Sequence, residues 1–262
     1  MFIKICGITN EEDALAAVAL GADAVGFVFA PSSRQIAPSL AGDIAKRLPR
    51  EIVTVGVFRN ESAQRLVEIV NGIGLHAAQL HGSETAGETR WIRQRVGAVI
   101  KAFPAGHPGI RDFAEFGADV LMVDGPSPGS GRMFDWRLLE GVVDPTKLML
   151  SGGLNPDNIT NAIRYVRPFG VDVSSGVEVS PGRKDFNKLK DFIVRVKKAS
   201  DAYCSPGQST SAETPRLGWP RSASARPGDA STGAGDGSDL SVGGATTGGS
   251  PPPIYDWKND EH

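Results

Sequence analysis

The chain has 262 residues, 40% of them hydrophobic, and a formal net charge of −2 at pH 7, which is enough apolar material for a sizeable core. Its charge balance excludes the strongly basic surface that is typical of nucleic-acid and membrane-binding proteins, and two cysteines are too few for a disulfide framework. No basic stretch leads into an apolar run near the first residue, and no run reaches the roughly 18 apolar residues of a membrane-spanning helix. We therefore expect a cytoplasmic protein without nucleic-acid or membrane partners.

Short β-rich runs alternate with helical patterns up to Ser200. The predicted strands cover residues 2–6, 24–29, 52–58, 77–80, 98–103, 119–124, 147–151 and 171–175. The predicted helices cover residues 11–20, 38–48, 62–71, 84–96, 109–116, 135–141, 158–166 and 185–199. Thr9, with Glu12 three residues later, forms a capping-box pattern before the first helix. Eight β/α units of about 25 residues each predict a (β/α)8 TIM barrel over residues 1–200, because a doubly wound sheet normally has fewer strands.

The composition changes sharply after Ser200. Of the 62 residues from 201 to 262, 31 are Gly, Pro, Ser or Thr, and such a segment cannot offset its ordering entropy by burying apolar surface. We predict a disordered tail over 201–262 and interpret it as a passive extension. The alternatives are a docking tail that uses Tyr255 and Trp257, or a non-catalytic barrel that binds partners through this tail.

Two reactive residues close predicted strands at the end of the barrel where active sites lie. Cys6 ends the first strand and Asp124 the sixth, so the fold brings together a base and an acid that are far apart in sequence. A free thiol has a pKa of about 8.5, so ionisation of Cys6 needs help from Lys4 on the same strand face or from the amides after Gly7. The alternatives are a small buried hydrophobe for Cys6 and a turn cap for Asp124.

Two neighbouring loops after the seventh and eighth strands are rich in glycine and serine. The first, LSGGLNPDNI, contains Gly152 and Gly153, and the second, DVSSGVE, contains Ser174, Ser175 and Gly176. Backbone amides in such loops suit a phosphate, which this fold frequently binds after its last two strands. Ordinary tight turns are the competing interpretation.

Three further polar residues are predicted to contact a substrate. Arg34 follows the second strand on a loop predicted to be mobile, where its guanidinium suits a carboxylate; a surface arginine is the alternative. His81 ends the fourth strand, with a core histidine as the alternative, and Asp172 lies near the substrate end of the eighth strand, in a ribulose contact or a structural role. No metal site is predicted, because only one histidine lies at the carboxyl end of a strand.

Eight motifs in a fixed order carry a resemblance to a known family. They read KICGIT, GADAVGFVF, SSRQI, QLHG, MVDG, GSGRMFDW, LSGGLNPDNI and GVDVSSGVEVSPGRKD. Together they resemble the phosphoribosylanthranilate isomerase family over residues 2–198. The resemblance implies a cofactor-free Amadori rearrangement of N-(5-phosphoribosyl)anthranilate in L-tryptophan biosynthesis, and we expect a monomer or a homodimer.

The resemblance also assigns roles to the residues at the strand ends. Asp124 would be the general acid that opens the ribose ring, and Cys6 would then remove the C2 proton. Arg34 would hold the anthranilate carboxylate, and the loops at 152–153 and 174–176 would hold the phosphate.

One loop departs from the family pattern, and one related enzyme is an alternative. Pro128 and Ser130 stand where the family has a more glycine-rich run, which predicts reduced loop flexibility. The histidine-pathway isomerase uses the same chemistry, but its barrel has an aspartate at the end of the first strand and resembles two phosphate-binding halves. Cys6 and a single pair of phosphate loops favour the anthranilate substrate and leave a second activity open.

Overall fold

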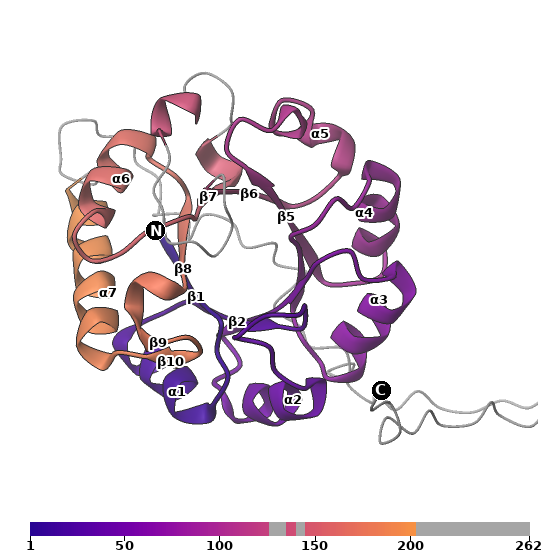
Figure 1. The fold of residues 1–262 in the computed structure, drawn as a ribbon, viewed down its shortest axis with the longest axis horizontal. Helices are drawn as coiled ribbons and strands as arrows, with labels where there is room; N and C mark the ends of the chain where they lie inside the picture. The colour runs from indigo at the N-terminus through magenta and orange to yellow at the C-terminus, as the bar shows by residue number, and fades with distance from the viewer. Residues whose placement is uncertain (126–134, 140–144, 203–262) are drawn as a thin grey trace, which may run out of the picture. The chain divides into compact units, whose positions relative to one another are not determined.

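Eight parallel strands close into a barrel in the computed structural model, which describes residues 1–125, 135–139 and 145–202. The strands follow one another around the ring in sequence order, with helices on the outside (Figure 1). They are β1 (Phe2–Cys6), β2 (Ala24–Val28), β3 (Val53–Phe58), β4 (Ala77–Leu80), β5 (Ala98–Pro104), β6 (Val120–Asp124), β7 (Leu148–Leu150) and β8 (Gly170–Val173). The predicted (β/α)8 TIM barrel is confirmed.

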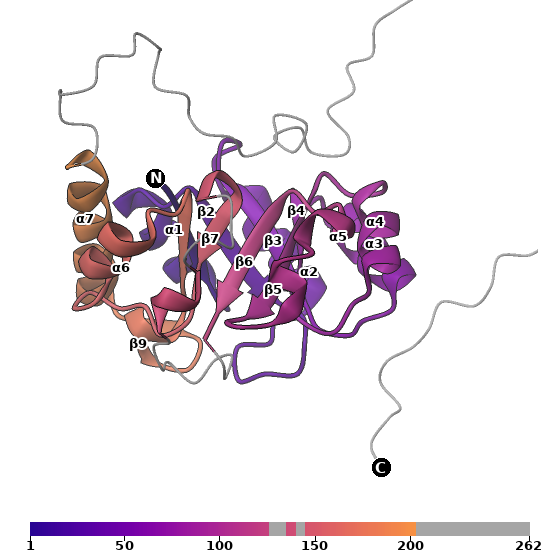
Figure 2. The ribbon, with the colours of Figure 1, turned by 90° about the horizontal axis from the view of Figure 1, so that it is seen from above.

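Helices and short 3₁₀ turns connect the strands, and Figure 2 shows α6 and α7 along one flank of the barrel with α3 and α4 along the other. The α-helices of the described residues are α1 (Glu11–Leu20), α2 (Pro38–Arg47), α3 (Ala63–Gly72), α4 (Ala86–Arg93), α5 (Phe113–Phe116), α6 (Ile159–Val166) and α7 (Phe186–Asp201). The 3₁₀ turns are η1 (Pro108–Ile110), η2 (Trp136–Leu139), η3 (Pro145–Lys147) and η4 (Ser175–Val177), and a hairpin of β9 (Glu178–Ser180) and β10 (Arg183–Lys184) follows β8.

Two predicted α-helices are replaced, in part or entirely, by 3₁₀ turns. The helix predicted over 109–116 is instead η1 followed by the four-residue α5, which ends at Gly117, where φ is 63°. This left-handed value stops the helix and favours glycine. The helix predicted over 135–141 is the 3₁₀ turn η2, and residues 140 and 141 lie outside the described residues.

Side chains alternate along the strands and form two separate cores. The core inside the barrel is built from Ala24, Val53, Val55, Ala77, Ala98, Ile100, Ala102, Val120, Met122 and Met149. The core between strands and helices includes Ile3, Ile5, Phe27, Leu80 and Val123. Burying one such large aliphatic or aromatic side chain contributes about 1.5–3 kcal/mol, so a one-residue slip of a strand, which exchanges the two faces, is strongly disfavoured.

The first helix is capped by a different residue from the one predicted. Asn10 is the N-cap, and its Oδ1 accepts a hydrogen bond from N of Asp13 at 2.9 Å. Thr9, predicted to begin a capping box with Glu12, instead donates its hydroxyl to the carbonyl oxygen of Gly182 at 2.6 Å. The capping-box prediction is therefore wrong, because the Thr9 hydroxyl holds the hairpin β9–β10 against the start of α1.

The last described helix ends slightly beyond the predicted domain boundary. Helix α7 continues to Asp201, one residue beyond the predicted boundary at residue 200. Residues 203–262 lie outside the described residues, as does the loop with Pro128 and Ser130, and the predictions for both stay predictions. Within the described part of the chain, no helix is long and apolar enough to cross a membrane.

Candidate active site

A cavity of about 370 Å³ lies at the carboxyl ends of the barrel strands. Nine of the ten site residues predicted from the sequence line it: Cys6, Arg34, His81, Asp124, Gly152, Gly153, Asp172, Ser174 and Ser175. They belong to β1, β6 and β8 or to the loops after β2, β4, β7 and β8. Closure of the barrel thus gathers, into one space, side chains that are widely separated in the sequence.

The Cys6 thiol lies inside the barrel beside the ammonium group of Lys4. Register pairs Cys6 with Gly26, and a Cβ on Gly26 would lie 2.9 Å from Cys6 Sγ and 3.1 Å from Lys4 Nζ. Burial raises the pKa of the Cys6 thiol above its ordinary value, although the charge of Lys4 acts in the opposite direction. The predicted help from Lys4 is present and reduces the burial penalty. The amides after Gly7 do not open a helix, since α1 begins only at Glu11.

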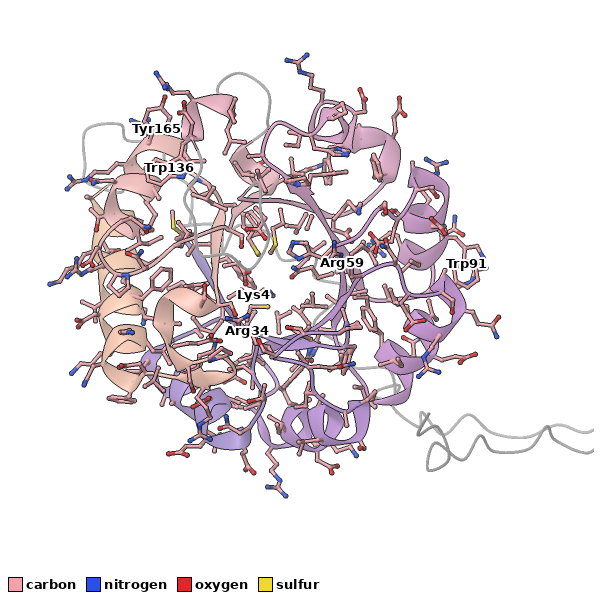
Figure 3. All side chains as sticks on the ribbon, viewed as in Figure 1. Lys4, Arg34, Arg59, Trp91, Trp136 and Tyr165 are labelled. Atoms are coloured by element: carbon pink, nitrogen blue, oxygen red, sulfur yellow. The ribbon has the colours of Figure 1, made fainter. Side chains whose placement is uncertain are left out.

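Lys4 is fully buried and forms an ion pair across the neighbouring strands β1 and β8. Its Nζ lies 2.7 Å from Oδ1 of Asp172, its partner in register, and Figure 3 shows Lys4 inside the ring of strands. Burial alone would lower the pKa of Lys4, but the negative charges of Asp172 and Cys6 outweigh it and raise the pKa above 10.5. Ser151 donates its hydroxyl to the other Asp172 oxygen at 3.3 Å. Asp172 therefore has a structural partner and still lines the cavity.

Asp124 ends β6 with both carboxylate oxygens in contact with neighbours. Its Oδ1 accepts a hydrogen bond from N of Gly125 at 2.7 Å, and its Oδ2 lies 3.1 Å from Nε2 of His81. The other ring nitrogen of His81 lies 3.1 Å from Nε2 of Gln79, which orients the imidazole. A Cβ on Gly152 would lie 2.8 Å from Asp124 Oδ1. His81 is thus placed directly beside the predicted acid, and the glycine leaves space for the carboxylate.

The two predicted phosphate loops touch at the rim of the cavity. Gly152 and Gly153 have φ values of 87° and 66°, which favour glycine. A Cβ on Gly176 would lie 1.9 Å from the carbonyl oxygen of Leu154, so Gly176 permits the loop contact and lies outside the cavity lining. The buried hydroxyl of Ser174 has no hydrogen-bond partner among the described residues. Such a group costs about 1–3 kcal/mol unless a ligand satisfies it, which favours an acceptor such as a phosphate oxygen here.

Arg34 is bound by a carboxylate of the chain itself, which the sequence did not predict. Its Nε and Nη2 donate to the carboxylate oxygens of Glu178 at 2.8–3.1 Å. Glu178 in turn accepts from the buried Lys184 at 2.9 Å. Glu178 and Lys184 both lie on the hairpin β9–β10. The sequence pointed to them only through the charged segment GVEVSPGRKD, the last motif of the family resemblance.

Two arginines line the cavity. Arg59, after β3, lines the cavity and has neither a hydrogen bond nor an ion pair with the described residues. With Arg34 it provides guanidinium donors suited to carboxylate and phosphate groups. Among residues 1–125, 135–139 and 145–202, no group of three or more His, Cys, Asp or Glu residues is arranged to hold a metal ion.

A family model and several curated relatives match this chain. The family model for N-(5'-phosphoribosyl)anthranilate (PRA) isomerase matches residues 3–195. The chain belongs to this family. The N-(5'-phosphoribosyl)anthranilate isomerase of Desulforudis audaxviator is 46% identical over 204 residues, which cover 75% of this chain and 98% of the relative. That of Thermotoga petrophila is 47% identical over 206 residues, 74% of this chain and 98% of the relative.

Solved isomerases of the family have the same fold. The phosphoribosyl anthranilate isomerase of Thermus thermophilus superimposes with a TM-score of 0.71 at 38% identity, covering 76% of this chain and 99% of that one. A phosphoribosyl anthranilate isomerase in complex with reduced 1-(o-carboxyphenylamino)-1-deoxyribulose 5-phosphate superimposes with a TM-score of 0.68 at 42% identity, with the same coverage. All ten predicted site residues lie within the residues matched by the isomerase family model.

Proposed function

We propose that this cavity isomerises N-(5'-phosphoribosyl)anthranilate to 1-(2-carboxyphenylamino)-1-deoxyribulose 5-phosphate, a step of L-tryptophan biosynthesis. The observation that carries the proposal is the placement of Cys6 and Asp124, from opposite parts of the sequence, in one cavity that also holds a guanidinium and an unsatisfied hydroxyl. Membership of the isomerase family supports it, as does a relative that binds the reduced form of the same product.

Asp124 acts first, as the general acid. Its proton goes to the ribose ring oxygen as the bond between that oxygen and C1 breaks, and the nitrogen lone pair forms the iminium. A carboxylic acid is competent for this transfer if it is held in its protonated form at the leaving oxygen. The contacts to Gly125 and His81 fix the carboxyl group, so that it meets the substrate in one orientation.

Cys6 acts second, as the general base. Its thiolate removes the C2 proton, which the iminium has acidified. The electron pair of the C2–H bond forms the C1–C2 double bond, and the π electrons of the C–N double bond return to the nitrogen and neutralise it. The enolamine then tautomerises to the ketone. The charge of the buried Lys4 favours the thiolate form, which the reaction needs and which burial opposes.

Two anionic groups hold the substrate across the cavity. The phosphate lies at the loops of Gly152–Gly153 and Ser174–Ser175, where its oxygens accept hydrogen bonds from the otherwise unsatisfied Ser174 hydroxyl and from backbone amides. The anthranilate carboxylate lies at Arg34, on the edge of the guanidinium that Glu178 leaves open. Fixing both ends places the ring oxygen and C2 at their two catalytic groups, which lowers the entropic part of the barrier.

The test is the loss of anthranilate-type fluorescence when purified protein is mixed with freshly generated phosphoribosylanthranilate. Wild-type protein is expected to convert it, whereas Cys6→Ser and Asp124→Asn lower turnover by about 10²–10⁴-fold with melting temperatures near wild type. A folded variant with near-normal turnover contradicts the role given to that residue. Turnover of the histidine-pathway aminoimidazole carboxamide substrate at a similar rate would contradict the assignment of a single substrate.

The assembly and the tail are tested separately. A related isomerase of Thermotoga maritima is dimeric. For this chain we propose a monomer or a homodimer in the cytoplasm. Light scattering measures which of the two assemblies forms. A chain truncated after Ala202 is expected to keep full isomerase activity. Loss of activity in a truncated but folded protein contradicts the passive interpretation of residues 203–262.

A further inference from the structure

Glu178 lies at the centre of a buried charge cluster beside the cavity, formed by Arg34, Glu178 and Lys184. Its side chain is only 4% exposed. One carboxylate oxygen accepts from Nε of Arg34 at 2.9 Å and from Nζ of Lys184 at 2.9 Å, and the other accepts from Nη2 of Arg34 at 2.8 Å. Burial opposes ionisation of this carboxyl, but the bonds from Arg34 and the charge of Lys184 outweigh it and hold the pKa of Glu178 below its ordinary range.

Lys184 ties this carboxylate to the catalytic strand ends. Its Nζ donates to the carbonyl oxygens of Cys6 at 2.6 Å and Ser174 at 3.3 Å, and its backbone N donates to Oδ2 of Asp13 at 2.9 Å. The position of Glu178 is therefore fixed against β1 and the loop after β8. The carboxylate of Glu178 is thus held by contacts to the barrel as well as by the hairpin β9–β10.

The geometry leaves one edge of the Arg34 guanidinium open. Glu178 uses the edge formed by Nε and Nη2, and no other residue of the described part of the chain takes Nη1 or the second N–H of Nη2, so these donors are left for another acceptor. The aliphatic part of Arg34 passes close to Gly7, where a Cβ would lie 2.7 Å from Arg34 Cδ and where φ is 74°. Arg34 lines the cavity, so a carboxylate bound there meets an arginine whose conformation is already set.

We propose that Glu178 is a positioning residue, which orients Arg34 so that the open edge of its guanidinium receives the carboxylate of the substrate's aromatic ring. The inference rests on the proposed function, in which Arg34 binds that carboxylate. A free arginine side chain loses substantial rotamer freedom when it is fixed, and a conformation fixed in advance removes that loss from the binding step. Glu178 therefore acts on substrate binding and not on the proton transfers.

A double-mutant cycle on KM distinguishes this role from a purely structural one. Glu178→Gln is expected to raise KM about tenfold and to change kcat little, because the amide cannot accept two bonds from Arg34 and one from Lys184. In an Arg34→Ala background the same substitution is expected to raise KM no further, since residues that act as a unit are not additive. Asp119→Asn is the matched control: it breaks the ion pair with Arg93 at the opposite end of the barrel and leaves KM unchanged.

A second variant keeps the test valid if Glu178→Gln does not fold. Glu178→Asp retains the negative charge beside Lys184 but withdraws it by one methylene from Arg34, and an intermediate rise in KM is expected. A wild-type KM in folded Glu178→Gln or Glu178→Asp overturns the inference, and so does a rise that adds fully to that of Arg34→Ala. An unchanged KM in Arg34→Ala overturns the carboxylate site itself, and with it the role of Glu178.

Discussion

Two buried lysine–carboxylate pairs in this barrel have nearly the same geometry and very different surroundings. Lys4 and Asp172 are 2.7 Å apart, as are Lys101 and Glu84, and both lysine side chains are at most 1% exposed. Lys4 points into the barrel, where it lies beside the Cys6 thiol. Lys101 points outward, between strand and helix, where it donates to the carbonyl oxygen of Gly82.

The difference teaches that burial and short distance do not identify a functional ion pair. Removing two charges from water costs about as much as their attraction returns, so each pair needs a further reason. Glu84 accepts hydrogen bonds from the amides of Asn60 and Gly82 and thus holds together the loops after β3 and β4. Asp172 has Lys4 on one oxygen and Ser151 on the other, and it lines the cavity. The pair of Lys101 and Glu84 stabilises two loops, and the pair of Lys4 and Asp172 lies beside the reactive thiol.

The largest expected difference between the pairs comes from removing each lysine. Lys4→Met takes away the cation beside the thiol and leaves Asp172 uncompensated, so turnover is expected to fall by about 10²-fold or more and stability by about 3–5 kcal/mol. Lys101→Met is expected to cost less stability, because the amides of Asn60 and Gly82 still satisfy Glu84, and to leave turnover near wild type. Both are measured by urea unfolding and by turnover per folded molecule.

The two lysine variants also control one another. Equal losses of turnover in Lys4→Met and Lys101→Met would mean that activity follows stability alone, and the distinction between the pairs would then fail. Assays at a temperature below the melting temperature of the less stable variant keep both proteins folded, so that a difference in turnover reflects the catalytic step.

The two lysine variants are also expected to differ in the pH dependence of Cys6 alkylation. Burial raises the pKa of Cys6 above 9.0 even with Lys4 present, so the thiolate fraction at neutral pH is small and increases about tenfold per pH unit below that pKa. Alkylation of Cys6 by iodoacetamide, in a Cys204→Ser background, is therefore expected to be slow at pH 7 and to accelerate through pH 9. Lys4→Met is expected to move this profile to still higher pH, whereas Lys101→Met leaves it in place. A Lys4→Met profile unchanged from wild type contradicts the coupling of ammonium and thiol.

The sequence predicted the inward face of the barrel better than its buried charge partners. Lys4 and Cys6 share a face because strand side chains alternate, and that follows from β1 alone. The partner Asp172 depends on closure of the barrel between β1 and β8, which the predicted fold also supplies. Glu178 was not predicted, because its partner Arg34 is 144 residues away and the fold of a hairpin after the last strand is not set by any period.

The capping-box prediction at Thr9 failed for the same physical reason, a contact with a segment distant in sequence. Thr9 and Glu12 fit a capping box, but the Thr9 hydroxyl finds a tertiary partner in Gly182, and Asn10 takes the cap. The pattern of one segment cannot reveal that another segment competes for its hydroxyl. The roles of Cys6, Asp124 and Arg34 came from strand-end placement and the family resemblance, and they stay predictions until the variants are assayed.

The smallest expected effect compares two glycines and isolates the contact between Lys4 and Cys6. Gly26→Ala places a methyl group 2.9 Å from Cys6 Sγ and 3.1 Å from Lys4 Nζ, so the thiol and the ammonium group must each shift away from that methyl group by a few tenths of an ångström. Turnover is expected to fall only a few-fold, because neither group is lost. Gly72→Ala, at the end of α3, meets nothing within 4 Å and is expected to stabilise the protein by about 0.5–1 kcal/mol without changing turnover. Wild-type turnover in Gly26→Ala would mean that the separation of thiol and ammonium does not limit the reaction, and the low turnover of Lys4→Met would then reflect the uncompensated charge of Asp172.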